Sequence, residues 1–156
     1  MTSIFVLLLI HLVGYATLFA ATVGGWIIHT HYRSANDYRA KSLLLKSLRP
    51  FGLLSPIAVA VMIASGIGNM VYFGIGPFSE GWLSAKLVFF LILVVMGMIF
   101  GIRSLRRSKL VAQLAEGTAP DGTATQVAAL DRQLSVFYPA LLVLLLIVLG
   151  LSVVRP

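Results

Sequence analysis

Four long apolar stretches dominate this chain and limit every fold that it can adopt. They cover residues 3–31, 51–73, 82–102 and 134–154. The hydrocarbon layer of a bilayer, about 30 Å thick, is crossed by about 20 apolar residues in a helix that rises about 1.5 Å per residue. Lipid offers no partners to backbone N–H and C=O groups, so each stretch must bond its own backbone as a helix. We therefore predict an all-α integral membrane four-helix bundle, with residues 1–156 forming one domain.

The composition of the chain supports this class of protein. Hydrophobic residues make up 59% of the sequence and charged residues 11%, whereas about a quarter of a typical soluble domain is charged. The first stretch has no basic leader and is longer than the hydrophobic part of a signal peptide, about 7–15 residues, so we expect a retained helix. The absence of cysteine excludes disulfides, thiolate metal sites and cysteine nucleophiles.

Basic residues gather in two of the three connections between the apolar stretches. Segments 32–50 and 103–133 contain most of the lysines and arginines, whereas segment 74–81 contains none. The positive-inside rule places both basic segments in the cytoplasm and both termini outside, and a plasma (inner) membrane is expected. The net charge of +7 then reflects loops that face anionic lipid, and we expect no nucleic-acid partner.

The cytoplasmic segments are expected to be partly helical. Residues 40–48 and 105–115 place apolar side chains at intervals of three and four residues, which predicts helical extensions of the second and third spans. Residues 116–125 are rich in Gly, Pro, Thr and Asp and are predicted to form the flexible linker.

Proline and glycine positions give further expectations about the helices. Pro50 and Pro56 predict a kinked start to the second span, and Pro139 is expected in the first turn of the fourth helix, where proline is tolerated. Gly97 and Gly101 form a GxxxG pattern, which we interpret as a site of helix packing.

Two ionisable side chains lie inside the predicted outer half of the membrane. His11 is about two turns into the first span and Lys86 about one turn into the third, so the two share a depth and can face each other. An ionisable group at this depth is a candidate for function because its burial in lipid costs at least about 2.5–3.5 kcal/mol at the membrane centre. His11 is either a haem ligand or proton carrier, or a structural hydrogen-bonding group. Lys86 either pairs with an anion such as a propionate or extends to the interface.

Other polar or sulfur-containing residues could support such a site. Tyr15 lies one turn below His11, and Met70 is expected in the same leaflet. His29 and His31 are expected at the cytoplasmic interface in structural roles, about 27–30 Å from His11 along a straight helix, too far to share one haem with it. The apolar stretches contain no Ser–His–Asp set, phosphate loop or paired carboxylates. Hydrolase and nucleotide chemistry are therefore not expected.

The most distinctive string is Glu80-Gly-Trp-Leu-Ser-Ala-Lys-Leu-Val-Phe-Phe, which resembles the GWLxxKL signature of HemJ-type protoporphyrinogen IX oxidases and the membrane domain of CopD-type copper proteins. The early His11, the basic entry to Pro56 and the closing Arg155-Pro156 pair agree with this resemblance. The chain departs from the family pattern at residues 130–133, where Leu-Asp-Arg-Gln replaces an Asn-Glu element.

This resemblance implies a four-helix membrane fold that binds haem b or a porphyrin, with His11 and Lys86 at the family's His and Lys positions. Our leading hypothesis is that His11 ligates iron, Lys86 pairs with a propionate, and Tyr15 and Met70 line the site, with redox work by the bound haem. The resemblance leaves open whether the chain is an oxidoreductase of the HemJ type. A copper-handling protein that uses His11 and Met70 is one alternative. A non-catalytic accessory subunit, in a homo-oligomer or a larger membrane complex, is another.

Overall fold

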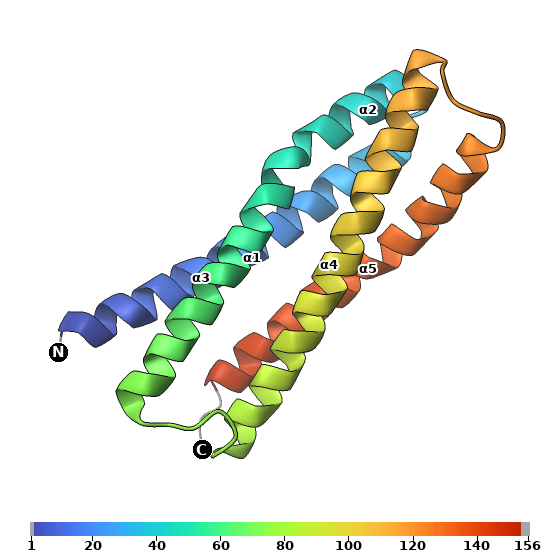
Figure 1. Ribbon diagram of the computed structural model, residues 1–156. Coiled ribbons are helices and arrows are strands. Elements are labelled where there is room, and N and C mark those ends of the chain that lie inside the picture. The colour runs from blue at the N-terminus through green and yellow to red at the C-terminus, as the bar shows by residue number, and fades with distance from the viewer. Residues whose placement is uncertain (1, 154–156) are drawn as a thin grey trace.

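The computed structural model describes residues 2–153, with side chains from residue 4 onward, and it is helical throughout apart from short connections. Val154 and the predicted Arg155-Pro156 ending lie outside the described residues. The helices in chain order are α1 (Thr2–Ser34), α2 (Tyr38–Ser47), α3 (Arg49–Phe73), α4 (Gly81–Glu116) and α5 (Thr123–Val153). Figure 1 shows the long helices α1, α3, α4 and α5 in one bundle, with the short α2 preceding α3.

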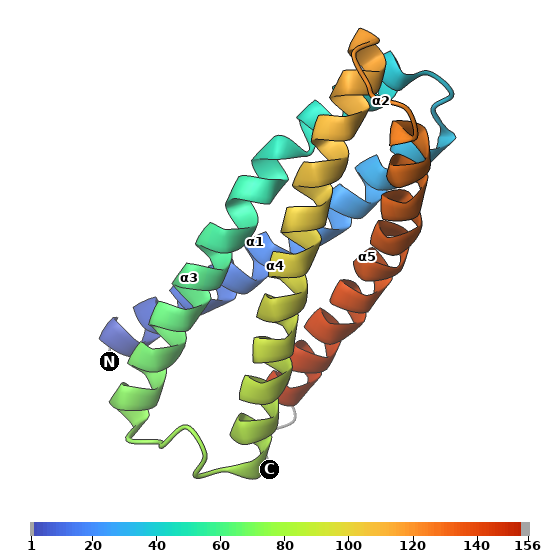
Figure 2. The same cartoon turned by 45° about the vertical axis from the view of Figure 1, so that its right-hand side comes forward.

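The bundle contains four segments that are long and apolar enough to cross a membrane: Ile4–Ser34, Tyr38–Phe73, Gly81–Glu116 and Thr123–Val153. The predicted fold class, an all-α four-helix membrane bundle, is therefore confirmed. The start of α1, the end of α5 and the loop between α3 and α4 lie at one end of the bundle (Figures 1 and 2). The opposite end carries α2 and the basic connections. Most lysines and arginines of the chain therefore lie at one end of the bundle.

The helices extend beyond the predicted spans at the basic end. As expected, α2 covers most of segment 40–48, and α4 continues through segment 105–115. However, α5 begins at Thr123, well before the predicted start at residue 134, so Pro139 lies inside α5 and our placement of it in a first turn was wrong. Val127 and Leu130 are buried along this added segment, and their burial stabilises helix where polar composition suggested a loop.

The junction between α2 and α3 follows from proline chemistry. Pro50 has no N–H to donate to the carbonyl of the fourth residue before it, so the helical hydrogen bonding is interrupted at Leu48. Pro56 lies inside α3. The predicted proline-containing start of this span is therefore present, with α2 and α3 separated by a single residue.

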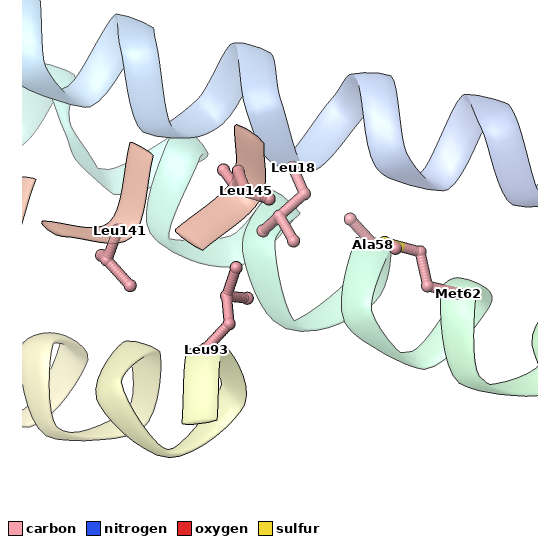
Figure 3. Close-up of a cluster of buried hydrophobic side chains, with 6 residues drawn as sticks. All are labelled: Leu18, Ala58, Met62, Leu93, Leu141 and Leu145. Carbon is pink, nitrogen blue, oxygen red and sulfur yellow. The ribbon is translucent and has the colours of Figure 1, made fainter. Parts of the chain in front are cut away.

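Two close helix pairs, α1 with α3 and α4 with α5, form the bundle. The four long helices meet in a central cluster of buried side chains, which Figure 3 shows. Its members are Leu18, Ala58, Met62, Leu93, Leu141 and Leu145. Outside this cluster, large apolar side chains such as Phe5 and Val71 are 67% and 77% exposed, as expected for surfaces solvated by lipid.

Glycine allows the close approach of α1 to its neighbours. A Cβ atom on Gly14 would lie 2.9 Å from Cγ of Met62, and one on Gly24 would lie 2.8 Å from Cε1 of Phe51. By contrast, a Cβ atom on Gly97 or Gly101 would meet nothing within 4 Å among the described residues. The prediction that the GxxxG pattern packs helices was therefore wrong within this chain, because no described side chain or backbone approaches either glycine closely.

Candidate functional sites

The first candidate site lies in the half of the bundle that contains the start of α1, where α1 packs on α3. The ring of His11 is joined to Ser65 by a hydrogen bond of 2.9 Å between Nδ1 and Oγ. Ser65 is buried, and its own hydroxyl donates to the carbonyl of Val61 over 2.6 Å. The His11 ring also lies beside Gly66, where an added Cβ would be 3.5 Å from Cε1.

The contacts of Ser65 are compatible with one particular tautomer of His11. When the Ser65 hydroxyl donates its proton to the carbonyl of Val61, Oγ accepts from Nδ1–H of His11. In that tautomer Nε2 of neutral His11 is unprotonated. This is the form in which histidine binds metals, and a second hydrogen bond of this kind commonly orients a metal-ligating ring.

That Lys86, near the start of α4, faces the His11 ring stays a prediction. A further polar group, missed in the sequence, lies one turn beyond Ser65 on the same face of α3: the Oδ1 atom of Asn69 is buried and has no hydrogen-bond partner among the described residues. A buried amide oxygen without a hydrogen bond is costly, so this side of α3 can accept a hydrogen bond from a ligand.

The other two predicted lining residues have different positions. The hydroxyl of Tyr15 donates to the carbonyl of Leu145 over 3.0 Å, which ties α1 to α5. Tyr15 thus has a partner within the bundle. Met70 lies five residues beyond Ser65, which is about 140° around the helix at about 100° per residue. It also lies four residues, about one helical turn, beyond Gly66, whose position is beside the His11 ring.

A second polar site lies at the basic end, and the sequence did not predict it. Arg107 on α4 is 0% exposed, although it lies in a segment that we expected to be cytoplasmic and solvated. Its Nη1 atom is 3.2 Å from Oδ1 of Asp131 in an ion pair. The other oxygen of Asp131 accepts a hydrogen bond of 3.1 Å from the hydroxyl of Tyr32, and the guanidinium lies over the Tyr32 ring, 4.6 Å from its centroid.

His29 completes this second site. It was expected at the interface, but it is only 2% exposed and lies against Tyr138, with ring centroids 5.0 Å apart. Arg107 donates to Nδ1 of His29 over 3.0 Å. Arginine can only donate, so neutral His29 carries its proton on Nε2. His29 is therefore in the opposite tautomer to His11, and its ring presents no lone pair for a metal.

Three donor atoms of the second site are buried without a hydrogen-bond partner among the described residues: Nε2 of His29, and Nε and Nη2 of Arg107. His31, in contrast, is exposed and bonded to the carbonyl of Ile27, as expected for an interfacial side chain. The second site is thus a buried ionic cluster that connects α1, α4 and α5 at the end of the bundle.

Some sequence signals for the missed residues existed. Asp131 lies between apolar residues at intervals typical of a buried helix face, and Arg107 lies at such an interval from Val111. Among the described residues, no group of three or more His, Asp or Glu side chains could hold a metal ion. Any metal at His11 therefore needs ligands of another kind.

Fold and sites together define a multi-pass helical membrane protein with a histidine site in one half and a buried ionic cluster at the other end. Comparisons with models of protein families, with curated proteins and with solved structures find no match to this chain.

Proposed function

We propose that this chain is a multi-pass protein of the bacterial inner membrane that binds haem b or a related porphyrin through His11, in the outer half of the bundle. The observation that carries the proposal is the hydrogen-bond chain from His11 to Ser65 and on to Val61. It restricts the orientation of the ring and is compatible with the tautomer in which Nε2 is unprotonated, and an axial ligand needs both.

The set of donor atoms favours a macrocycle over a bare metal ion. A structural or transport site for a bare ion generally needs three or four protein ligands, and the described part of the chain has no such group of His, Asp and Glu. A porphyrin supplies four nitrogens itself and needs only one or two ligands from the protein. A single, oriented histidine in an apolar bundle fits that requirement.

The neighbouring residues have distinct roles in this proposal. Lys86, which is predicted to face His11, is suited to pair with a propionate, and Asn69 offers an unpaired amide on the same side of α3. Tyr15 holds α5 against α1 below the ring through its bond to Leu145. Met70 remains a predicted lining residue. Bound haem would supply one-electron redox chemistry, so the chain would serve as an oxidoreductase or electron carrier.

Titration of haem into the haem-free protein in lipid nanodiscs tests this proposal. Wild type and a His31→Ala control should bind one haem per chain with similar affinity, because His31 is exposed at the far end of α1. His11→Ala should abolish the saturable phase. Saturable binding of equal strength in all three proteins would contradict the assignment of His11.

Metal analysis of the same preparations distinguishes copper handling from haem binding. Soft ligands such as methionine sulfur suit cuprous ion, and Met70 is the sulfur that the sequence singles out. Copper that co-purifies with wild type and is lost in Met70→Ala, together with no haem binding, would support copper handling and overturn the haem proposal.

A further inference from the structure

An open groove runs along the outer face of α4 and α5 at the basic end of the bundle. Two adjoining hollows, of about 610 Å³ and 460 Å³, share Arg103, Ala129 and Gln133 in their walls, so they form one groove. Three arginines line it: Arg103, Arg106 and Arg132. The groove is separate from the His11 site, which lies between α1 and α3.

The arginines of this groove have no acidic partner. Within residues 2–153, the ion pair between Arg107 and Asp131 involves neither the groove arginines nor any other groove residue. Arg106 donates to the amide of Gln126 over 3.4 Å, and Arg103 lies over the ring of Phe137 at 5.3 Å. These neutral neighbours orient the guanidinium groups and leave their charges uncompensated. The groove therefore attracts anions.

Apolar side chains line the part of the groove that lies toward the centre of the bundle. Ile102 is 69% exposed and Val136 is 65% exposed, and both border the groove next to the arginines. This combination occurs where predicted span 82–102 ends and α4 continues into the basic segment. The groove thus lies at the depth of the cytoplasmic lipid headgroups, with its charged part outward and its apolar part toward the acyl chains.

We propose that this groove binds an anionic phospholipid of the cytoplasmic leaflet, with the phosphate at Arg103, Arg106 and Arg132 and an acyl chain along Ile102 and Val136. Basic pockets between helices on the cytoplasmic side are suited to such headgroups, and guanidinium binds phosphate in a bidentate manner. The apolar border explains why the occupant is a lipid: a soluble phosphate compound would gain nothing from Ile102 and Val136.

Native mass spectrometry of the full chain, with phosphatidylglycerol or phosphatidylcholine added to the detergent-solubilised protein, tests the groove. Wild type should retain phosphatidylglycerol in preference to phosphatidylcholine. The triple variant Arg103→Gln, Arg106→Gln, Arg132→Gln should bind phosphatidylglycerol at least about tenfold more weakly, because it removes the charge-assisted hydrogen bonds from the guanidinium groups to the phosphate. The control Arg39→Gln, Lys46→Gln, Lys109→Gln removes equal charge from exposed positions outside the groove and should retain wild-type binding.

The remaining outcomes would overturn the proposal. If both triple variants lose phosphatidylglycerol binding equally, the lipid is attracted to the basic surface in general and does not occupy a specific site. Inorganic phosphate that displaces phosphatidylglycerol at equal concentration would show a soluble-anion site. Circular dichroism and a monodisperse elution profile of the groove variant check that it folds, and neither measurement depends on whether the chain binds haem.

Discussion

Arg107 on α4 donates a hydrogen bond to Nδ1 of His29 on α1 over 3.0 Å. The same nitrogen of Arg107 pairs with Asp131 on α5, so one buried guanidinium connects three helices. Removing one partner of a buried ion pair leaves an uncompensated charge, whereas replacing the pair with apolar side chains does not. This cluster is therefore expected to dominate the stability of the basic end.

The variant Arg107→Met should lower the free energy of unfolding by about 3–5 kcal/mol, because Asp131 stays in place without its cation. Unfolding in mixed detergent, followed by circular dichroism, measures this change. Arg106→Met is the matched control, since Arg106 is exposed and should change stability by no more than about 0.5 kcal/mol. The double variant Arg107→Met, Asp131→Leu should recover much of the loss. An unaltered stability in Arg107→Met would disprove the role of the cluster.

The hydrogen bond from His11 to Ser65 gives a prediction for haem affinity. Ser65→Ala should weaken haem binding about 10–100-fold, as loss of a group that orients a ligating histidine commonly does. Ser55→Ala is the control, because Ser55 on the same helix bonds only to the carbonyl of Phe51. Equilibrium titration in nanodiscs gives both affinities. Equal affinities for the two variants would argue against orientation of His11 by Ser65.

Variants of Gly14 and Gly97 test whether each glycine packs within the chain or against a partner protein. Gly14→Val should destabilise the bundle by about 1–3 kcal/mol through overpacking, because even a Cβ atom there would lie 2.9 Å from Met62. Gly97→Val should leave the isolated bundle stable, since nothing lies within 4 Å of that position. If Gly97→Val instead abolishes a dimer or a co-purifying complex in native membranes, the accessory-subunit alternative gains support. The readouts are thermal unfolding and size on a native gel.

The predicted topology can be tested with single cysteines, because the chain has none of its own. Thr118→Cys lies in the exposed loop between α4 and α5, and Ser79→Cys lies in the exposed loop between α3 and α4. In intact cells, an impermeant maleimide should label the cysteine at position 79 and not that at position 118. In inverted membrane vesicles the pattern should reverse, and the opposite result would show that the positive-inside assignment is wrong.

The span architecture was predictable because hydrophobic length is a direct physical requirement of the bilayer. The part of α5 that precedes Leu134 was not predicted. Its buried residues Val127 and Leu130 alternate with polar residues, so this segment contains no continuous apolar run. At Gly97 and Gly101, by contrast, the sequence predicted a packing contact that the structure does not contain. A glycine pattern identifies a surface on which close packing is possible, but the sequence alone does not say whether the partner is in the same chain.

The sites were predictable only in part. His11 and Lys86 stood out because ionisable residues are rare in spans, and the structure places His11 against Ser65 of α3. Ser65 and Asn69 were overlooked because small polar residues are common in membrane helices. Arg107 was interpreted as one of many loop cations, and its burial depends on Tyr32 and Asp131, which are distant in sequence and meet it only in the folded bundle.

The reduced-minus-oxidised absorption spectrum of protein purified from haem-replete cells tests the central claim most directly. The account predicts bands of a b-type haem in wild type and in His31→Ala, and their loss in His11→Ala that is otherwise folded and inserted in the membrane. A wild-type spectrum without haem bands, or the same bands in His11→Ala, would contradict it.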